Sequence, residues 1–180
     1  MSRIFGELRQ TAFVVSDIDR AMDYWSRVLG VGPFFIKRKI QFTDYVYRGK
    51  ASDSPTVSIA LANSGSMQIE LLQQHDEKPS LYREFIEKKA EGLQHMASWY
   101  TKAGFDEKRS QLLEQGYKIA QECTIPSSGV RLVYFDTEAD NGVVFEIADL
   151  LEPGQYERVM GIVKAAENWA GDQAVREVLQ

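Results

Sequence analysis

One of the two histidines of this 180-residue chain lies in the middle of a short apolar segment. His95 stands in the sequence GLQHMASW, residues 92–99, where His95, Ala97 and Trp99 share one face of an extended strand. The opposite face is not equally polar, so both faces are expected to be covered. A lone histidine of this kind is ordinarily a buried side chain whose ring N–H donates a hydrogen bond to a neighbouring carbonyl. A functional role therefore depends on what other segments bring to it.

Two glutamates each lie between apolar residues of an extended segment. Glu70 stands in MQIELL, residues 67–72, and Glu146 stands in VVFEIA, residues 143–148. Burying a carboxylate in a strand costs free energy unless the group is paired or bound to a cation. Because two such carboxylates occur in matching places, the pattern indicates a partner that they share.

The chain repeats one order of elements, β-α-β-β-β, after about 85 residues. Gln10 holds in the first repeat the position that His95 holds in the second. If the two repeats curl toward each other, Gln10, Glu70, His95 and Glu146 converge inside one half-open barrel. One imidazole nitrogen and three oxygens, two of them anionic, suit one divalent ion (Zn, Ni, Co, Mn or Fe) and leave positions for water or substrate.

The elements that must position these residues are predicted from periodicity and turn residues. A first module, residues 8–72, is expected to contain a strand at 8–15, a helix at 18–29 and strands at 34–42, 57–61 and 67–72. A linker, residues 73–91, carries an amphipathic helix at 80–88. A second module, residues 92–150, is expected to contain the strand of His95, a helix at 105–114 and strands at 117–123, 130–136 and 143–148, with a turn at 140–142.

The last segment, residues 151–180, is predicted to be a helical extension. Its apolar residues recur at helical intervals from residue 153 onward: Tyr156, Val159, Met160, Val163, Ala166, Trp169 and Ala170. This apolar stripe is expected to pack either on the chain's own sheet or on a second subunit.

Several short motifs together resemble the vicinal oxygen chelate superfamily, with the closest likeness to glyoxalase I and methylmalonyl-CoA epimerase. They are QTA at 10–12, VSDIDRA at 15–21, YW at 24–25, VLG at 28–30, IELL at 69–72, GLQHMA at 92–97 and GVVFEI at 142–147. The resemblance spans residues 8–150 and implies an α+β fold. In that fold two βαβββ modules form a half-open, mixed-sheet barrel, the glyoxalase/bleomycin resistance/dioxygenase fold, which this chain extends with a C-terminal helix.

The resemblance also implies roles for individual residues. Gln10, Glu70, His95 and Glu146 become the ligands of one divalent metal ion, and a metal-bound glutamate moves a proton next to a carbonyl while the metal stabilises the enolate oxygen. Glu146 is the first candidate for this base and Glu70 the second. The implied activity is that of an isomerase, an epimerase or a lyase, and the resemblance implies a homodimer.

Two departures separate this chain from the specific relatives. Val14 stands where glyoxalase I of the human type has an arginine for the glutathione carboxylate, and Ser54-Pro55 stand where the epimerase is expected to have a second catalytic glutamate. The chemistry of the superfamily is therefore implied, whereas neither specific activity is.

The same alternation predicts a substrate pocket beside the metal. Val14, Gln68 and Trp99 share the face of the four metal-ligand candidates, and Tyr47 and Arg48 are expected at its mouth. Such a lining is apolar and aromatic, which favours a small apolar or aromatic substrate over a highly charged one.

Composition sets further bounds. The net charge is -5 and Lys and Arg are scattered along the chain, so nucleic acid is not an expected partner. The sequence has neither an apolar run long enough for a membrane span nor a signal-peptide core, and the single Cys123 has no partner for a disulfide. We therefore expect a cytoplasmic protein with a small-molecule substrate and no membrane partner.

Two other functions are weighed against the metal-dependent enzyme. A non-enzymatic small-molecule binding or resistance protein of the same superfamily generally lacks the metal ligands, whereas this chain has all four. In an iron-dependent ring-cleaving dioxygenase of this superfamily, the resemblance implies a metal site of two histidines and one glutamate. This chain has Gln10 in place of one histidine, which disfavours that function.

Overall fold

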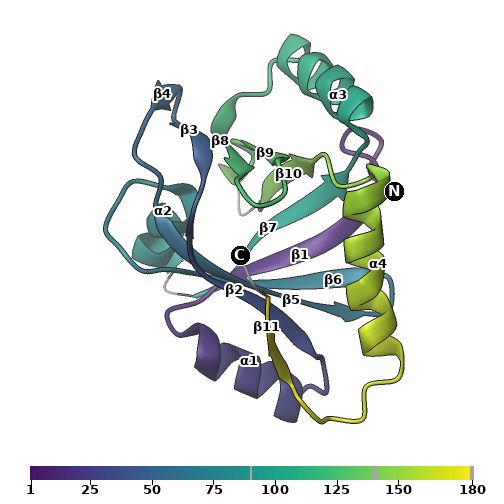
Figure 1. Ribbon diagram of the computed structural model, residues 1–180. Helices are drawn as coiled ribbons and strands as arrows, with labels where there is room; N and C mark the ends of the chain where they lie inside the picture. Colours follow the sequence, from purple (N-terminus) through teal and green to yellow (C-terminus); the bar gives the residue numbers. More distant parts are fainter. Residues whose placement is uncertain (90, 140–141, 179–180) are drawn as a thin grey trace.

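The computed structural model describes residues 1–89, 91–139 and 142–178, and all eleven of its strands belong to one mixed sheet (Figure 1). The strands follow the spatial order β11-β2-β5-β6-β1-β7-β10-β9-β8-β3-β4. Two helices cover its outer face, α1 over one half and α3 over the other. The predicted α+β fold is confirmed.

Four strands of the first repeat lie together in one half of this sheet, and its other two strands join the edge of the other half. Its elements are β1 (Leu8–Val14), α1 (Ile18–Arg27), β2 (Phe34–Gln41), β3 (Thr43–Tyr47), β4 (Lys50–Ala51), β5 (Thr56–Ser64) and β6 (Met67–Gln74). Helix α1 begins at a cap in which the Asp17 carboxylate accepts the backbone N–H of Arg20. The helix ends at Arg27, two residues before the predicted end.

The linker helix, the second repeat and the C-terminal segment complete the molecule. Their elements are α2 (Leu81–Lys89), β7 (Gly92–Trp99), α3 (Lys102–Glu114), β8 (Ile119–Ile125), β9 (Val130–Phe135), β10 (Val144–Ala148), α4 (Pro153–Glu167) and β11 (Val175–Glu177). The turn predicted at 140–142 lies partly outside the described residues.

The sheet is strongly curved, and the chain connectivity shows why. Phe42 is the one residue between β2 and β3, although these strands stand near opposite ends of the spatial order. The two ends of the sheet must therefore approach each other, which gives the half-open barrel (Figure 1). Both repeats lie side by side within one chain, because β1 pairs with β7.

Strands β3 and β4 were not predicted. β3 pairs with β8 of the other repeat, and Asp44 in its middle has a backbone φ of 50°. A short strand whose partner residues lie 74 or more positions away leaves little signal in its own sequence.

The C-terminal segment also differs from the prediction. The helix ends at Glu167, so Trp169 and Ala170 lie beyond it, and the chain then forms β11 in parallel with β2. Val159 of α4 is buried in the cluster that fills the concave side of the sheet, and α4 contacts β5. The apolar stripe thus packs on the chain's own sheet. No helix among the described residues is long and apolar enough to cross a membrane.

Candidate metal centre on the concave face

Gln10, Glu70, His95 and Glu146 converge on the concave side of the sheet, and we call them the quartet. They stand on β1, β6, β7 and β10, which are neighbours in the order β6-β1-β7-β10. Strand alternation turns all four toward the interior, and their exposed fractions are between 0% and 8%. The structure therefore brings together the four residues that the sequence singled out.

The side chains of the quartet lie within one small volume. The His95 Nε2 atom is 3.3 Å from Glu146 Oε2 and 4.0 Å from Glu70 Oε1. The Gln10 Nε2 atom donates to Glu70 Oε2 at 2.9 Å and to Gln68 Oε1 at 2.8 Å. One imidazole nitrogen thus faces two carboxylates, and an amide supports one of them.

Gln94 fixes the orientation of the imidazole, and sequence reasoning missed it. The pairing of β1 with β7 shifts by one residue between Ala12 and Phe13, a bulge that buries Gln94 next to His95. The Gln94 Oε1 atom lies 2.6 Å from His95 Nδ1 and accepts its hydrogen. In that tautomer Nε2 carries the lone pair, and it has no hydrogen-bond partner among the described residues.

Burial dominates the electrostatics of the quartet. It raises the pKa of Glu70 to about 8, against a smaller lowering by the hydrogen bond from Gln10. Burial also raises the pKa of Glu146 well above its ordinary value; the nearby Glu70 adds to this rise, and a hydrogen bond from Tyr134 opposes it. For His95 the desolvation lowers the pKa to about 3. Without a cation the site therefore favours protonated carboxyls beside a neutral imidazole.

Two tyrosines complete the surroundings of the imidazole. The Tyr134 ring meets the His95 ring edge to face, with centroids 5.2 Å apart, and its hydroxyl accepts a hydrogen bond of 2.9 Å from Tyr82. Tyr82 comes from α2, so this contact ties the linker helix to the quartet. Neither tyrosine was predicted as a site residue. Tyr134 lies on β9 and Tyr82 on α2, and only the folded chain brings these elements next to the quartet.

The donor set fits a divalent ion. Two ligand atoms that each lie about 2.0–2.2 Å from one ion are roughly 3–4.4 Å apart, and both distances from His95 Nε2 fall within this range. The side chains are not yet in ligating positions, since no three His, Cys, Asp or Glu residues within the described ranges are arranged to hold a metal. For Gln10 to contribute its oxygen, its terminal amide must turn, because it now presents its NH2 group to Glu70.

Residues 9–135 match the sequence profile of the Glyoxalase/Bleomycin resistance protein/Dioxygenase superfamily, which covers well over half of the chain. The chain belongs to this superfamily. No curated protein matches it in sequence.

Several solved structures share the fold at low sequence identity. Methylmalonyl-CoA epimerase from Mycobacterium tuberculosis is 18% identical with a TM-score of 0.57, and the match covers 82% of this chain and 90% of that one. A hypothetical protein from Bacillus halodurans is 20% identical with a TM-score of 0.57, over 79% and 92%. A Streptomyces coelicolor methylmalonyl-CoA epimerase variant in complex with 2-nitronate-propionyl-CoA is 16% identical with a TM-score of 0.54, over 78% and 92%.

In this superfamily member the concave face is filled. Leu81, Tyr82 and Phe85 of α2 are buried in the same apolar cluster as Val14 and Trp99. The predicted pocket residues therefore share the face of the quartet as expected, but α2 occupies the space that an open pocket would need.

The two residues predicted at the mouth of the pocket contact α2. The guanidinium of Arg48 binds the Glu84 carboxylate through Nε at 3.1 Å and Nη2 at 2.9 Å, and the Tyr47 hydroxyl donates to the same carboxylate. Arg48 also pairs with Asp136, and Lys88 pairs with Glu138. Through Glu84 and Lys88 the linker helix is thus bound to the end of β3 and to the segment that follows β9.

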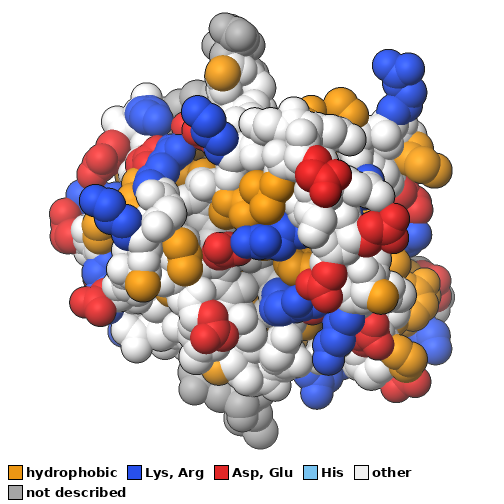
Figure 2. Space-filling view, turned by 90° about the horizontal axis from the view of Figure 1, so that it is seen from above, with side chains coloured by type: hydrophobic (Ala, Val, Ile, Leu, Met, Phe, Trp, Pro, Cys, Tyr) orange, Lys and Arg blue, Asp and Glu red, His pale blue; other side chains and the backbone are white. Residues whose placement is uncertain are grey.

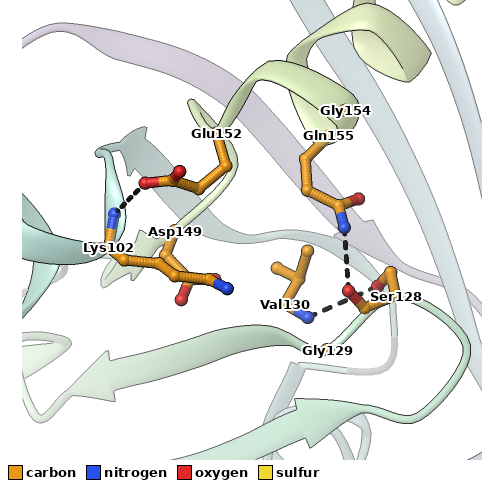
Figure 3. Close-up of a pocket in the computed structure, with 8 residues that line it drawn as sticks. All are labelled: Lys102, Ser128, Gly129, Val130, Asp149, Glu152, Gly154 and Gln155. Atoms are coloured by element: carbon orange, nitrogen blue, oxygen red, sulfur yellow. Dashed lines mark hydrogen bonds between the residues drawn. The ribbon is translucent and has the colours of Figure 1, made fainter.

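Two cavities lie elsewhere on the molecule. The smaller, about 100 Å³, is formed where α4 begins (Figure 3): Gln155 reaches the Ser128 carbonyl, and Glu152 accepts the backbone N–H of Lys102. The larger, about 240 Å³, lies near the end of α4. Figure 2 shows charges of both signs interspersed around hydrophobic side chains on one face, rather than gathered by sign.

The first prediction concerns the stability of the chelator-treated protein against pH. Above the ordinary carboxyl pKa the unfolded chain is ionised, while folded Glu70 keeps its proton up to about pH 8, so the free energy of unfolding falls as pH rises. His95 acts in the opposite direction, but only between about pH 3 and its ordinary pKa of 6.5. Between pH 7 and 8 urea denaturation should therefore show a fall of about 1 kcal/mol per pH unit or more.

Glu70→Gln provides the comparison for this measurement. The amide cannot ionise, so the free energy of unfolding of this variant should fall less between pH 7 and 8 than that of the unchanged protein. Equal slopes in the two proteins, or a stability that rises over this range, would contradict the assignment of a buried, protonated Glu70.

The second prediction concerns access past α2. Cys123 is buried in the same cluster as Tyr82 and Phe85, so its alkylation by iodoacetamide reports on opening of the concave face. Glu84→Gln removes the charge that binds Arg48. If this weakens the attachment of α2 by roughly 1 kcal/mol, the opened state becomes about fivefold more populated, and the alkylation rate should rise about fivefold. Glu87→Gln is the matched control, because Glu87 lies on the same helix and pairs with Arg83.

The alkylation is measured under native conditions at one pH for all three proteins. If Glu84→Gln and Glu87→Gln change the rate equally, α2 is not held by the contact with Arg48.

Proposed function

We propose that this chain is a divalent-metal-dependent enzyme that transfers a proton at a carbon next to a carbonyl group. The observation that carries the proposal is the unpartnered His95 Nε2, which faces two buried carboxylates from different strands. Membership of the superfamily supports it, because its members commonly use a divalent metal. Zn, Ni, Co, Mn and Fe(II) all suit the donor set.

The quartet would hold the ion. His95 would contribute Nε2 and Glu70 and Glu146 their carboxylates, with Gln10 as the fourth ligand after its amide turns. When bound, the ion supplies Lewis acidity that stabilises negative charge on a carbonyl oxygen. Gln94 keeps the imidazole in the tautomer that leaves Nε2 free, and its role is to position His95.

Glu146 is our candidate for the base and Glu70 the second candidate. Both are buried carboxylates whose oxygens lie within 4.0 Å of the imidazole nitrogen, so either lies next to the place where a substrate carbonyl would meet the ion. They stand on β6 and β10, with β1 and β7 between them, so they reach the interior from two sides. Epimerisation needs removal of a proton from one face of a carbon and return to the other, which two such groups could perform.

The surroundings of the quartet favour a small apolar or aromatic substrate. Val14, Leu72, Trp99 and Val144 share its face, and all four are buried apolar residues. Several superfamily members of similar fold are methylmalonyl-CoA epimerases, so an acyl thioester is one such substrate to test. We further propose that α2 moves to admit the substrate, since the quartet is buried. A homodimer and a cytoplasmic location stay predictions.

The third prediction tests metal and proton transfer together. The chelator-treated protein is expected to take up one equivalent of Co²⁺, and the loaded protein is expected to exchange the acidic hydrogen of a carbonyl substrate for deuterium in D2O, followed by NMR. Methylmalonyl-CoA, and methylglyoxal with glutathione, are the first substrates. Glu146→Gln should lower the exchange rate by about 10²-fold or more.

Glu122→Gln is the control, because Glu122 lies on β8 and pairs with Arg109 away from the quartet. One equivalent of metal without exchange would leave a lyase to be tested. A protein that binds no metal and exchanges no substrate would contradict the proposal and favour a small-molecule binding protein.

A further inference from the structure

Two buried tyrosine hydroxyls connect the linker helix to the quartet. Tyr82 of α2 is 0% exposed and Tyr134 of β9 is 1% exposed, and both belong to the apolar cluster on the concave side. The Tyr82 hydroxyl donates to the Tyr134 hydroxyl at 2.9 Å, and the two rings meet edge to face. A hydroxyl surrounded by apolar side chains needs a hydrogen-bond partner, so this contact fixes the orientation of both groups.

Tyr134 also contacts two members of the quartet. It is the register partner of Glu146 across β9 and β10, so the two side chains are neighbours on the concave face. Its hydroxyl donates a hydrogen bond to Glu146. Its ring meets the His95 ring edge to face, with centroids 5.2 Å apart. Tyr134 therefore lies between α2 and the quartet.

The hydrogens of these hydroxyls can be placed in only one order. A phenol has one hydrogen to donate, and an ionised carboxylate, the form that binds a metal ion, can only accept. The Tyr134 oxygen accepts the hydrogen of Tyr82, and its own hydrogen is then directed to Glu146. Without Tyr82 the Tyr134 hydroxyl would lose a partner and would be free to turn. The orientation of Glu146 thus depends on where α2 lies.

This dependence bears on the binding of a metal ion. A carboxylate ligand is oriented by a hydrogen bond from a residue that does not itself touch the ion, and loss of such a bond typically weakens metal binding about 10–100-fold. The Tyr134 hydroxyl is placed to orient Glu146 in this way, and Gln94 orients His95. Each of these two members of the quartet therefore has a neighbour that fixes its direction.

Another buried tyrosine holds the linker but hydrogen-bonds no member of the quartet. The Tyr45 hydroxyl of β3 donates to the Gln121 Oε1 atom and to the Pro79 carbonyl just before α2, each at 3.0 Å. Neither Gln121 nor Pro79 belongs to the quartet. Tyr45 therefore helps to hold the linker without a bond that leads to Glu146, whereas Tyr82 does both.

We propose that Tyr134 positions Glu146 for the metal ion and that Tyr82 makes this positioning depend on the docking of α2. The inference rests on the proposed function, because it concerns the ion that the quartet would hold. Both tyrosines are positioning residues, since each acts through Glu146 rather than on a substrate. Docking of α2 and binding of the ion then strengthen each other, and movement of α2 loosens the hold on Glu146, the candidate base.

The fourth prediction concerns Co²⁺ binding by the full chain after chelator treatment, with the Kd measured by titration against a competing chelator. Tyr82→Phe removes one hydroxyl and keeps the ring, and it should raise the Kd about threefold or more. Tyr134→Phe removes the donor to Glu146 itself and should raise the Kd about tenfold or more. Tyr45→Phe is the matched control, because it removes another buried hydroxyl that holds the linker, and it should leave the Kd unchanged.

Alkylation of Cys123 measures the same coupling from the side of α2. Because coupling between two binding events is reciprocal, Co²⁺ should slow alkylation, and this slowing should be about threefold smaller in Tyr82→Phe than in Tyr45→Phe.

The outcomes separate this inference from the proposed function. An unchanged protein that takes up no Co²⁺ would contradict the proposed function and the inference with it. An unchanged protein that takes up Co²⁺, while Tyr82→Phe and Tyr45→Phe have equal Kd values and equal slowing of alkylation, would overturn the coupling through the tyrosines alone.

Discussion

Two buried carboxylates lie close to one neutral imidazole nitrogen, Glu146 at 3.3 Å and Glu70 at 4.0 Å from His95 Nε2. This constraint governs the rest of the structure. Burial makes the ionised form of each carboxylate costly, and each raises the cost for the other. The same burial keeps His95 from supplying the compensating charge. The site therefore needs either protons on Glu70 and Glu146 or a cation between them. Our account takes the cation as the functional state.

The sheet topology produces this constraint. Parallel pairing of β1 with β6 and of β7 with β10, joined by antiparallel pairing of β1 with β7, sets four inward positions side by side. The passage from β2 to β3 through one residue curls the sheet around them. Helix α2 then covers the open side, and its Tyr82 reaches the hydroxyl of Tyr134 beside the imidazole. We propose that a substrate reaches the quartet when α2 moves.

The sequence predicted the repeat, the fold and the inward face of the quartet because these rest on local patterns. Alternation along a strand shows which residues share a face. Glu70 and Glu146 could be recognised because each is a charged residue between apolar ones. It did not predict β3 and β11, since each depends on a partner strand distant in sequence. Gln94 was missed for another reason: a bulge turns it inward against the alternation of its strand. The filling of the concave face by α2 was missed because a helix's amphipathic pattern does not say which surface it covers.

The most direct test of the shared cation is X-ray diffraction from crystals grown with Co²⁺, measured at wavelengths on both sides of the cobalt absorption edge. Our account predicts one anomalous peak within about 2.0–2.2 Å of His95 Nε2 and of a carboxylate oxygen from both Glu70 and Glu146. A map with no peak at this position, and with a direct hydrogen bond between His95 and Glu146, would contradict this account.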